Sequence, residues 1–239
     1  PRLERRSFHL FELGPTLLEL GAGPYLRRIT LWHDEDAAAL EVAEGQVWES
    51  HAASVPSMAR ELLREEDLLS TEDLGSVEIT GDDTRTLNAL RHRGLLTAGQ
   101  VARLLRRRAR RTLAAPFGWP HGELSIRETR RRPRASSSGV DLAQAIAFIV
   151  RSHGDPALVE GLFHQMRDKN AVPVSPSLEH QQPLMPAEER FLAELPPNAP
   201  LSQALGSFWD EGREGAFAAL FLCVELGLVR LEQGTAAPQ

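Results

Sequence analysis

The stretch GLLTAGQVARLLRRRARRTLAAPFGWPHGELSI, residues 94–126, decides the fold. Thr97 stands before a run whose apolar residues recur at helical spacing, and Pro116 closes that run. We therefore expect Thr97 to cap a helix over 98–115, followed by an edge strand at 122–126. The apolar side chains expected in the core are Val101, Leu104, Leu105, Leu113, Phe117 and Trp119.

The same stretch carries a dense run of arginines. They occupy the sides of the expected helix that the apolar stripe leaves open: Arg103, Arg106, Arg107, Arg108, Arg110 and Arg111. The basic segment 127–134 adds further arginines. Three interpretations compete: a solvated face, a contact for an acidic protein, or a contact for a phosphate backbone. A helix that reads DNA also offers Asn, Gln, Ser or Thr to base edges, and this one has almost none, which disfavours nucleic acid.

Charge is distributed unevenly along the chain. The whole sequence has a formal net charge of −6, yet residues 91–134 hold 13 arginines against Glu123 and Glu128. The rest of the chain is therefore strongly acidic. Such a basic block can dock an acidic partner, or it can pair with the acidic surface of its own chain.

Composition is that of an ordinary globular protein, with 239 residues, 42% of them apolar and 25% charged. No apolar run is long enough to span a membrane, and PRLERRSF (1–8) has no signal-peptide core. Cys223 is the single cysteine, which excludes an internal disulfide and favours a cytoplasmic location. Of the 27 basic residues only Lys169 is a lysine, a bias more typical of a GC-rich bacterial genome than of a function.

The remaining pattern before residue 94 mixes strands and helices. Turn residues stand at HDED (33–36) and at Gly45, and Gly94 suits the end of a helix. Ser54 and Pro56 suit the first turn of a further helix. The expected elements are a helix at 8–20 interrupted near Gly14 and Pro15, strands at 25–32 and 38–50, a helix at 54–69, a short strand at 75–80 and a helix at 84–93.

The second half reads as mostly helical. The sequence predicts a flexible basic loop at 127–139, helices at 140–152 and 156–168, and a proline-rich linker at 171–186. A final unit follows, with helices at 187–195, 200–209 and 213–226 and a strand at 227–233. Its element order resembles a winged helix, but its third helix is almost wholly apolar and favours burial over a DNA groove. Cys223 in that helix is expected to be an inert buried thiol.

No known catalytic or metal-binding signature is present. The eight histidines show no ligand spacing, and the nucleophile-elbow, phosphate-loop and dinucleotide-binding glycine motifs are missing. We therefore expect no catalytic residue, no cofactor and no metal. The fold class expected from the whole pattern is α+β: a small antiparallel sheet with packed helices, followed by the helical winged-helix-like module.

Several motifs together resemble the PATAN-type domain of bacteria. They are Gly94, Leu95, Leu96 and Thr97 before the long charged helix, then Phe117 and Trp119, then Gly122 and Leu124 at a strand. Upstream, LEVAEGQVWESHA (40–52) is similar to the hairpin of that family, and downstream MPAEERFLAEL (185–195) is similar to the helical module that often follows it. The resemblance extends from about residue 8 to residue 233.

The resemblance implies a non-enzymatic scaffold or adaptor in bacterial signalling or cell polarity. Its partner would present an acidic surface, such as a receiver domain or a Ras-like small GTPase. The domains implied are a PATAN-like domain at 1–135, connecting helices at 140–170, the linker at 171–186 and the winged-helix-like module at 187–233. The arginines expected at the partner contact are Arg103, Arg107, Arg110, Arg111 and Arg131. The alternative is a transcription regulator that uses the arginine-rich helix and the C-terminal module on DNA.

Overall fold

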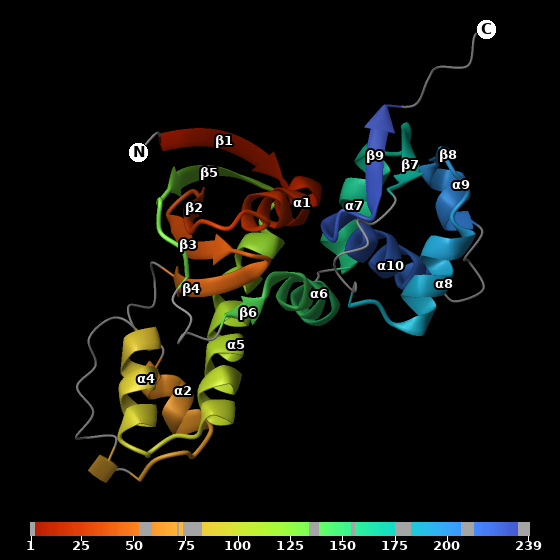
Figure 1. Cartoon of the computed structure of the whole chain (residues 1–239). Helices are drawn as coiled ribbons and strands as arrows, with labels where there is room; N and C mark the ends of the chain where they lie inside the picture. The colour runs from red at the N-terminus through yellow and green to blue at the C-terminus, as the bar shows by residue number, and fades with distance from the viewer. Residues whose placement is uncertain are drawn as a thin grey trace, which may run out of the picture.

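A computed structural model describes most of the chain (Figure 1). The described residues are 3–52, 59–70, 72–73, 83–133, 139–153, 156–174, 183–206 and 213–233. Helices pack against two antiparallel sheets, so the predicted α+β class is confirmed. The expected strand at 75–80 and the residues Ser54 and Pro56 lie outside the described residues.

The larger sheet has the strand order β1-β5-β2-β3-β4-β6, and all its pairs are antiparallel. Its strands are β1 (Leu3–His9), β2 (Arg27–His33), β3 (Asp36–Ala43), β4 (Gln46–Ala52), β5 (His121–Glu128) and β6 (Val140–Asp141). The hairpin turns predicted at HDED and Gly45 are present, with positive φ at Asp34, Glu44 and Gly45.

Two predictions about this sheet were wrong. The segment 122–126 was expected at an edge, but β5 lies between β1 and β2. The edge is instead β1, which the sequence did not reveal, and the predicted helix at 8–20 begins only at Leu10. Strand β1 could not be recognised from the sequence because Phe8 is its only described buried side chain, so the alternation of apolar and polar residues typical of a strand is missing. Its pairing partner is β5, which lies more than a hundred residues away along the chain. Gly122 allows this pairing, because a Cβ there would meet the Phe8 ring at 2.6 Å.

Helices α1 (Leu10–Gly21), α5 (Ala98–Ala114) and α6 (Leu142–His153) cover the inner face of the sheet (Figure 1). The predicted interruption of α1 near Gly14 and Pro15 was wrong, since the helix runs through both residues. Pro15 costs the helix one backbone hydrogen bond, but Leu13 and Leu17 are fully buried on either side of it. Their burial holds the helix together across the proline.

The N-terminal half of α5 extends beyond the sheet and meets α2 (Ala59–Glu65) and α4 (Asp83–His92). The predicted cap is confirmed, because Thr97 Oγ1 accepts a hydrogen bond from the Gln100 N–H at 3.2 Å. Gly94 ends the preceding turn at φ 75°. After α5, the short 3₁₀ helix η1 (Pro116–Gly118) leads into β5. All six apolar side chains predicted for the core of this stretch are buried.

The C-terminal unit gathers helices around α10 (Arg213–Glu225). Its elements are α7 (Pro156–Gln165), β7 (Lys169–Pro173), α8 (Pro186–Glu194), β8 (Ala199–Pro200), α9 (Leu201–Gly206), α10 and β9 (Val229–Gln233). The small sheet has the order β8-β7-β9, so residues 171–173 belong to a strand and not to the predicted linker. Because β9 pairs with a strand that precedes α8, the winged-helix resemblance is not confirmed and stays a prediction. The predicted burial of the third helix is confirmed, as Leu220, Phe221 and Cys223 are at most 1% exposed.

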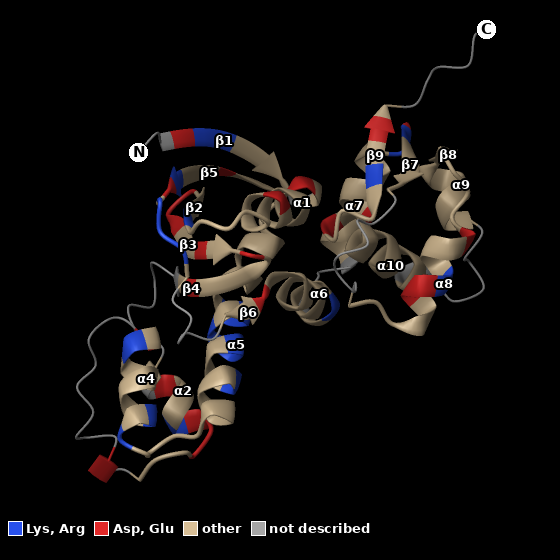
Figure 2. Cartoon of the chain, viewed as in Figure 1, with Lys and Arg blue, Asp and Glu red and all other residues tan. Residues whose placement is uncertain are grey.

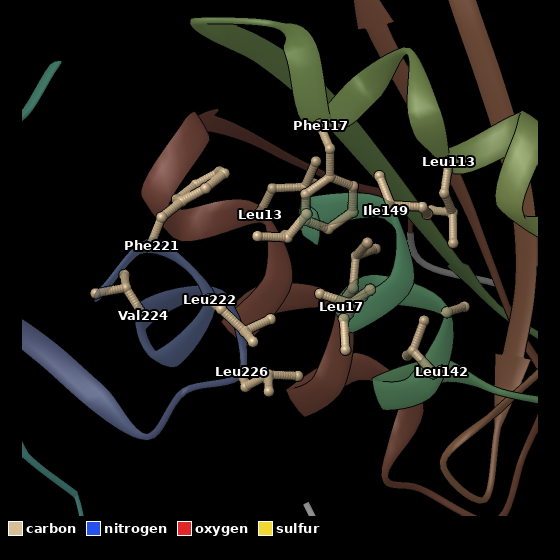
Figure 3. Packing of buried hydrophobic residues seen from close by; sticks show 14 of the residues in the cluster. Leu13, Leu17, Leu113, Phe117, Leu142, Ile149, Phe221, Leu222, Val224 and Leu226 are labelled. Carbon is tan, nitrogen blue, oxygen red and sulfur yellow. The ribbon is translucent and has the colours of Figure 1, made fainter. Parts of the chain in front are cut away.

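Helix α10 also joins this unit to the first one. Figure 3 shows Phe221 and Leu222 of α10 beside Leu13 and Leu17 of α1 within a single continuous apolar cluster. A polar contact lies in the same interface, where Gly14 N–H donates to Glu225 Oε2 at 2.6 Å. Among the described residues, no helix is long and apolar enough to cross a bilayer.

Candidate functional site: an arginine cluster on the sheet

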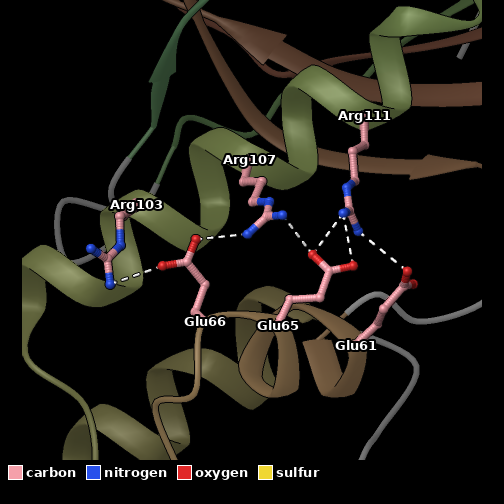
Figure 4. Close-up of polar contacts among 6 residues, drawn as sticks. All are labelled: Glu61, Glu65, Glu66, Arg103, Arg107 and Arg111. Atoms are coloured by element: carbon pink, nitrogen blue, oxygen red, sulfur yellow. Dashed lines mark hydrogen bonds and ion pairs between the residues drawn. The ribbon is translucent and has the colours of Figure 1, made fainter.

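The arginines predicted as a partner contact on α5 are mostly occupied within the chain. Arg103, Arg107 and Arg111 lie one turn apart and face the carboxylates of Glu61, Glu65 and Glu66 beside α2 (Figure 4). We call this set the α5–α2 ladder. Of the two alternatives for the basic block, pairing with the acidic surface of its own chain therefore holds for these three arginines.

The contacts of the ladder are short. Arg107 contacts Glu66 Oε1 at 2.7 Å and Glu65 Oε2 at 2.6 Å. Arg103 contacts Glu66 Oε2 at 3.0 Å, and Arg111 contacts Glu65 Oε2 at 2.7 Å. The hydrogen bond from Arg111, followed by the charges of Arg111 and Arg107, lowers the pKa of the Glu65 carboxyl against the opposing effect of desolvation. The ladder is thus a structural contact between two helices.

Two further arginines of α5 contact protein groups. The Arg110 guanidinium lies 3.7 Å from the centre of the half-exposed Phe148 ring, a cation–π geometry. Burial, followed by the charge of Arg106, lowers the pKa of Arg110 from its usual value. Arg108 was expected to face solvent, and this was wrong: it is 2% exposed and donates to Thr84 Oγ1 at 2.9 Å. Its position on the α4 side of the helix explains the burial.

Arg131 differs from the arginines of α5, because it is exposed on a short segment after β5. That segment was predicted to be a flexible loop, but its first residues are tied to the start of β2. Thr129 N–H donates to the carbonyl of Leu26 at 2.9 Å, and Leu26 N–H donates to the carbonyl of Arg131 at 2.8 Å. The loop expected at 127–139 therefore begins as strand and turn, and 134–138 lie outside the described residues.

The sheet brings other arginines to the same place. Arg28 of β2 and Arg127 of β5 are directly paired in register, and both belong to the outer face, because their neighbours Ile29 and Ile126 point inward and are buried. Arg5 of β1 lies on this face as well, diagonally across from Arg127. Together with the segment after β5 they form what we call the arginine cluster: Arg5, Arg28, Arg127, Arg130, Arg131 and Arg132.

These six side chains are exposed, and none has a carboxylate within ion-pair distance among the described residues. The neighbouring Arg6 and Arg27 do have such partners, Glu4 at 2.7 Å and Glu128 at 3.3 Å. Like charges directly opposite each other destabilise a sheet, as at Arg28 and Arg127. A surface on which such electrostatic repulsion is present without a structural benefit is a candidate binding site.

Other groups define the extent of the cluster. Figure 2 shows basic segments gathered along β1 and at the end of β5 with the segment that follows it. Tyr25 is 42% exposed beside them, with its ring 5.8 Å from the Arg132 guanidinium. Across β2 the positive surface ends at β3, where Glu41 lies opposite Arg28. The cluster is thus a strip over β1, β5 and β2 with one aromatic side chain at its margin.

The opposite end of the same strands carries an aromatic group of another kind. The His33 ring stacks on Trp119 with centroids 5.7 Å apart and meets His121 edge-on at 5.1 Å. No group of three or more His, Cys, Asp or Glu side chains suited to a metal ion occurs in the part of the chain that the structure describes. Cys223 is buried, and desolvation raises the pKa of its thiol to about 12.

Sequence reasoning found Arg131 and the segment around it, but it missed Arg5 and Arg28. Those residues lie about a hundred positions from Arg127 along the chain, and only the strand order brings them together. No local signal could have found them, because the pairing of Arg28 with Arg127 depends on a register that joins distant parts of the chain. Comparison with protein-family models, with curated proteins and with solved structures finds no match for this chain.

Proposed function

We propose that the chain is a non-enzymatic adaptor that docks an acidic surface of a protein partner through the arginine cluster. The observation that carries this proposal is the contrast between two sets of arginines. On α5, Arg103, Arg107 and Arg111 contact the glutamates of the α5–α2 ladder, and Arg110 contacts Phe148. The arginines of the cluster are instead exposed and lack carboxylate partners among the described residues. The proposed contact surface therefore lies on the sheet and not on α5. Among the contact residues predicted from the sequence, Arg131 is the one that belongs to it.

The chemistry of arginine supports a protein carboxylate as the target. A guanidinium binds a carboxylate through two parallel hydrogen bonds, and a row of them steers an acidic partner at long range. The exposed Tyr25 at the margin suits a protein interface, where tyrosine and arginine are enriched. The resemblance to the PATAN-type domain agrees with this proposal, and with a partner of the receiver or small-GTPase class in a bacterial cytoplasm.

The runner-up, a DNA-binding regulator, has weaker support. Its recognition helix would be α10, whose apolar side chains are buried against α1, α6 and the helices of its own unit. A helix enclosed in this way has no face to place in a groove. The arginine cluster could still contact phosphates, so the test of the proposal includes nucleic acid as an outcome.

The test is affinity capture from native lysate with and without nuclease. The bait is the wild-type chain or a triple variant, Arg28→Glu, Arg127→Glu and Arg131→Glu. The matched control, Arg64→Glu, Arg93→Glu and Arg106→Glu, makes the same change in net charge at exposed arginines elsewhere. We expect a nuclease-resistant protein that the cluster variant loses and the control retains. Retention by both variants, or a capture that nuclease abolishes, contradicts the proposal.

A further inference from the structure

Strand β1 is an edge strand with one open side. Among the described residues it pairs only with β5, in seven consecutive positions from Leu3 to His9. Figure 1 shows no other described element along its second side. In an antiparallel strand, alternate residues direct their N–H and C=O groups away from the partner. The outer side of β1 therefore presents a row of backbone groups that can pair with another strand.

The first half of β1 is accessible on both faces as well as at its edge. Glu4, Arg5, Arg6 and Ser7 are exposed, and Phe8 is the first buried side chain along the strand. Helix α1 packs only beneath the end of the strand, where it begins at Leu10. A strand laid along this edge would thus meet no described side chain in its path.

The charge beside the edge selects which strand can be added. Arg5 lies on the outer face, diagonally across from Arg127 of β5, and Arg28 lies one strand further on, in β2. On the inner face Arg6 is already paired with Glu4 at 2.7 Å, so the uncompensated charge is on the outer face alone. Residues directly opposite each other in adjacent strands have their Cβ atoms about 5 Å apart, so one carboxylate of the added strand would meet Arg5. Carboxylates at every second position would all lie on the outer face with it.

The same charges disfavour other occupants of the edge. A second copy of β1, paired so that Arg5 lies opposite its own counterpart, would place like charges against each other on the outer face, which is destabilising. A neutral strand would leave the outer-face arginines uncompensated. An acidic strand would form both the backbone hydrogen bonds and the charge pairs. In strand addition the backbone hydrogen bonds usually provide affinity, and the side-chain contacts provide specificity.

We propose that an extended acidic segment of the partner protein adds to the open edge of β1, with carboxylates at alternate positions on the outer face and one of them opposite Arg5. This inference rests on the proposed function, and it specifies the form in which the acidic partner binds. It also assigns a role to β1, whose exposed residues contribute little to the apolar core.

The experiment uses the full chain and a fluorescein-labelled peptide of alternating Glu and Thr, seven residues long. Two further peptides carry N-methyl groups, one on its Glu residues and the other on its Thr residues. In an added strand only one of these two sets donates N–H groups to β1. We expect one methylated peptide to bind at least tenfold more weakly than the parent in fluorescence anisotropy, and the other to bind within about twofold of it. Arg5→Glu should weaken the parent, whereas Arg64→Glu should leave it unchanged.

Two results would overturn the inference. An equal effect of the two methylation patterns, whether no loss or the same loss, shows that the peptide is held by charge without strand addition, and leaves the proposed function standing. Absence of parent binding at low salt also overturns the inference. The proposed function is judged separately, by whether the triple cluster variant loses its captured protein.

Discussion

At the residue scale, Glu225 of α10 and Gly14 of α1 form a close contact that a change of a few atoms would disrupt. Glu225 is fully buried in the interface of α10 and α1, and its Oε2 accepts from Gly14 N–H at 2.6 Å, while its Oε1 has no hydrogen-bond partner in the described structure. Desolvation raises the pKa of this carboxyl well above its usual value, and the charge of Glu12 adds to the effect. Burial therefore favours the neutral carboxylic acid over the carboxylate at this position, and the hydrogen bond from Gly14 opposes that effect.

The Glu225→Gln variant should be more stable than the wild type at neutral pH. A carboxyl whose pKa is raised on folding contributes most stability below its unfolded pKa of about 4.5, and that stability falls as pH rises toward the folded pKa. Each unit of the shift costs about 1.4 kcal/mol. Unfolding by denaturant from pH 4.5 to 8 should show a smaller pH slope for the variant. The exposed control Glu194→Gln should keep the wild-type slope, and an unchanged slope in Glu225→Gln would contradict the assignment.

Gly14→Ala should destabilise the chain strongly. A Cβ at Gly14 would lie 2.1 Å from the backbone oxygen of Glu225, so one of the two helices must shift. We expect a loss of about 3 kcal/mol in the free energy of unfolding, typical of overpacking at a tight contact. Gly161 in α7 is the matched control, because nothing lies within 4 Å of a Cβ built there. Gly161→Ala should stabilise by up to about 1 kcal/mol through helix propensity. Similar effects at both positions would refute the close approach.

At the scale of elements, the α5–α2 ladder explains how a short helix is held beside a long one. Helix α2 has seven residues and would not persist alone. It buries Leu62 and Leu63 against its neighbours and places its glutamates against the arginines of α5. Substitution of Arg107 or Arg111 therefore tests folding and not docking.

Arg107→Glu should lower the melting temperature, because the new carboxylate would face Glu65 and Glu66. We expect a decrease of about 2–4 °C, larger at low salt, and a smaller decrease for Arg107→Met, which removes the charge without reversing it. The neighbouring exposed Arg106 serves as control, and Arg106→Glu should change the melting temperature little. Equal melting temperatures for Arg107→Glu and Arg106→Glu would count against the ladder.

Local signals in the sequence identified elements whose stability is mainly local. Thr97, Gly94 and the apolar stripe of α5 predicted that helix and its core residues correctly, because capping and periodicity act within a few residues. Strand β1 and the true position of β5 could not be predicted, since one buried side chain does not mark a strand. The arginine cluster was missed for the same reason: Arg5, Arg28 and Arg127 meet only through strand order.

At the scale of the whole molecule, α10 connects the two units through one apolar cluster. Phe221 and Leu222 pack against α1, so separation of the units would expose buried surface on both sides. Differential scanning calorimetry should therefore show a single unfolding transition. Two transitions separated by several degrees would mean that the units unfold independently.

The arginine cluster stands out against the charge of the whole surface. The chain is acidic overall at −6, yet six exposed arginines on β1, β2, β5 and the segment after β5 have no carboxylate partners in the described structure. The arginines of α5 show that this sequence can neutralise such side chains internally. The cluster is thus available for an external acidic group.

The measurement that tests this claim most directly is photo-crosslinking from the margin of the arginine cluster. A benzophenone amino acid replaces Tyr25, which is 42% exposed beside the cluster, and in a second protein it replaces Leu95, which is 36% exposed near the far end of α5. We expect an acidic protein to be crosslinked from position 25 and not from position 95, with loss of the product at high salt. Crosslinking from position 95 alone, or a salt-insensitive product from both positions, would contradict the claim.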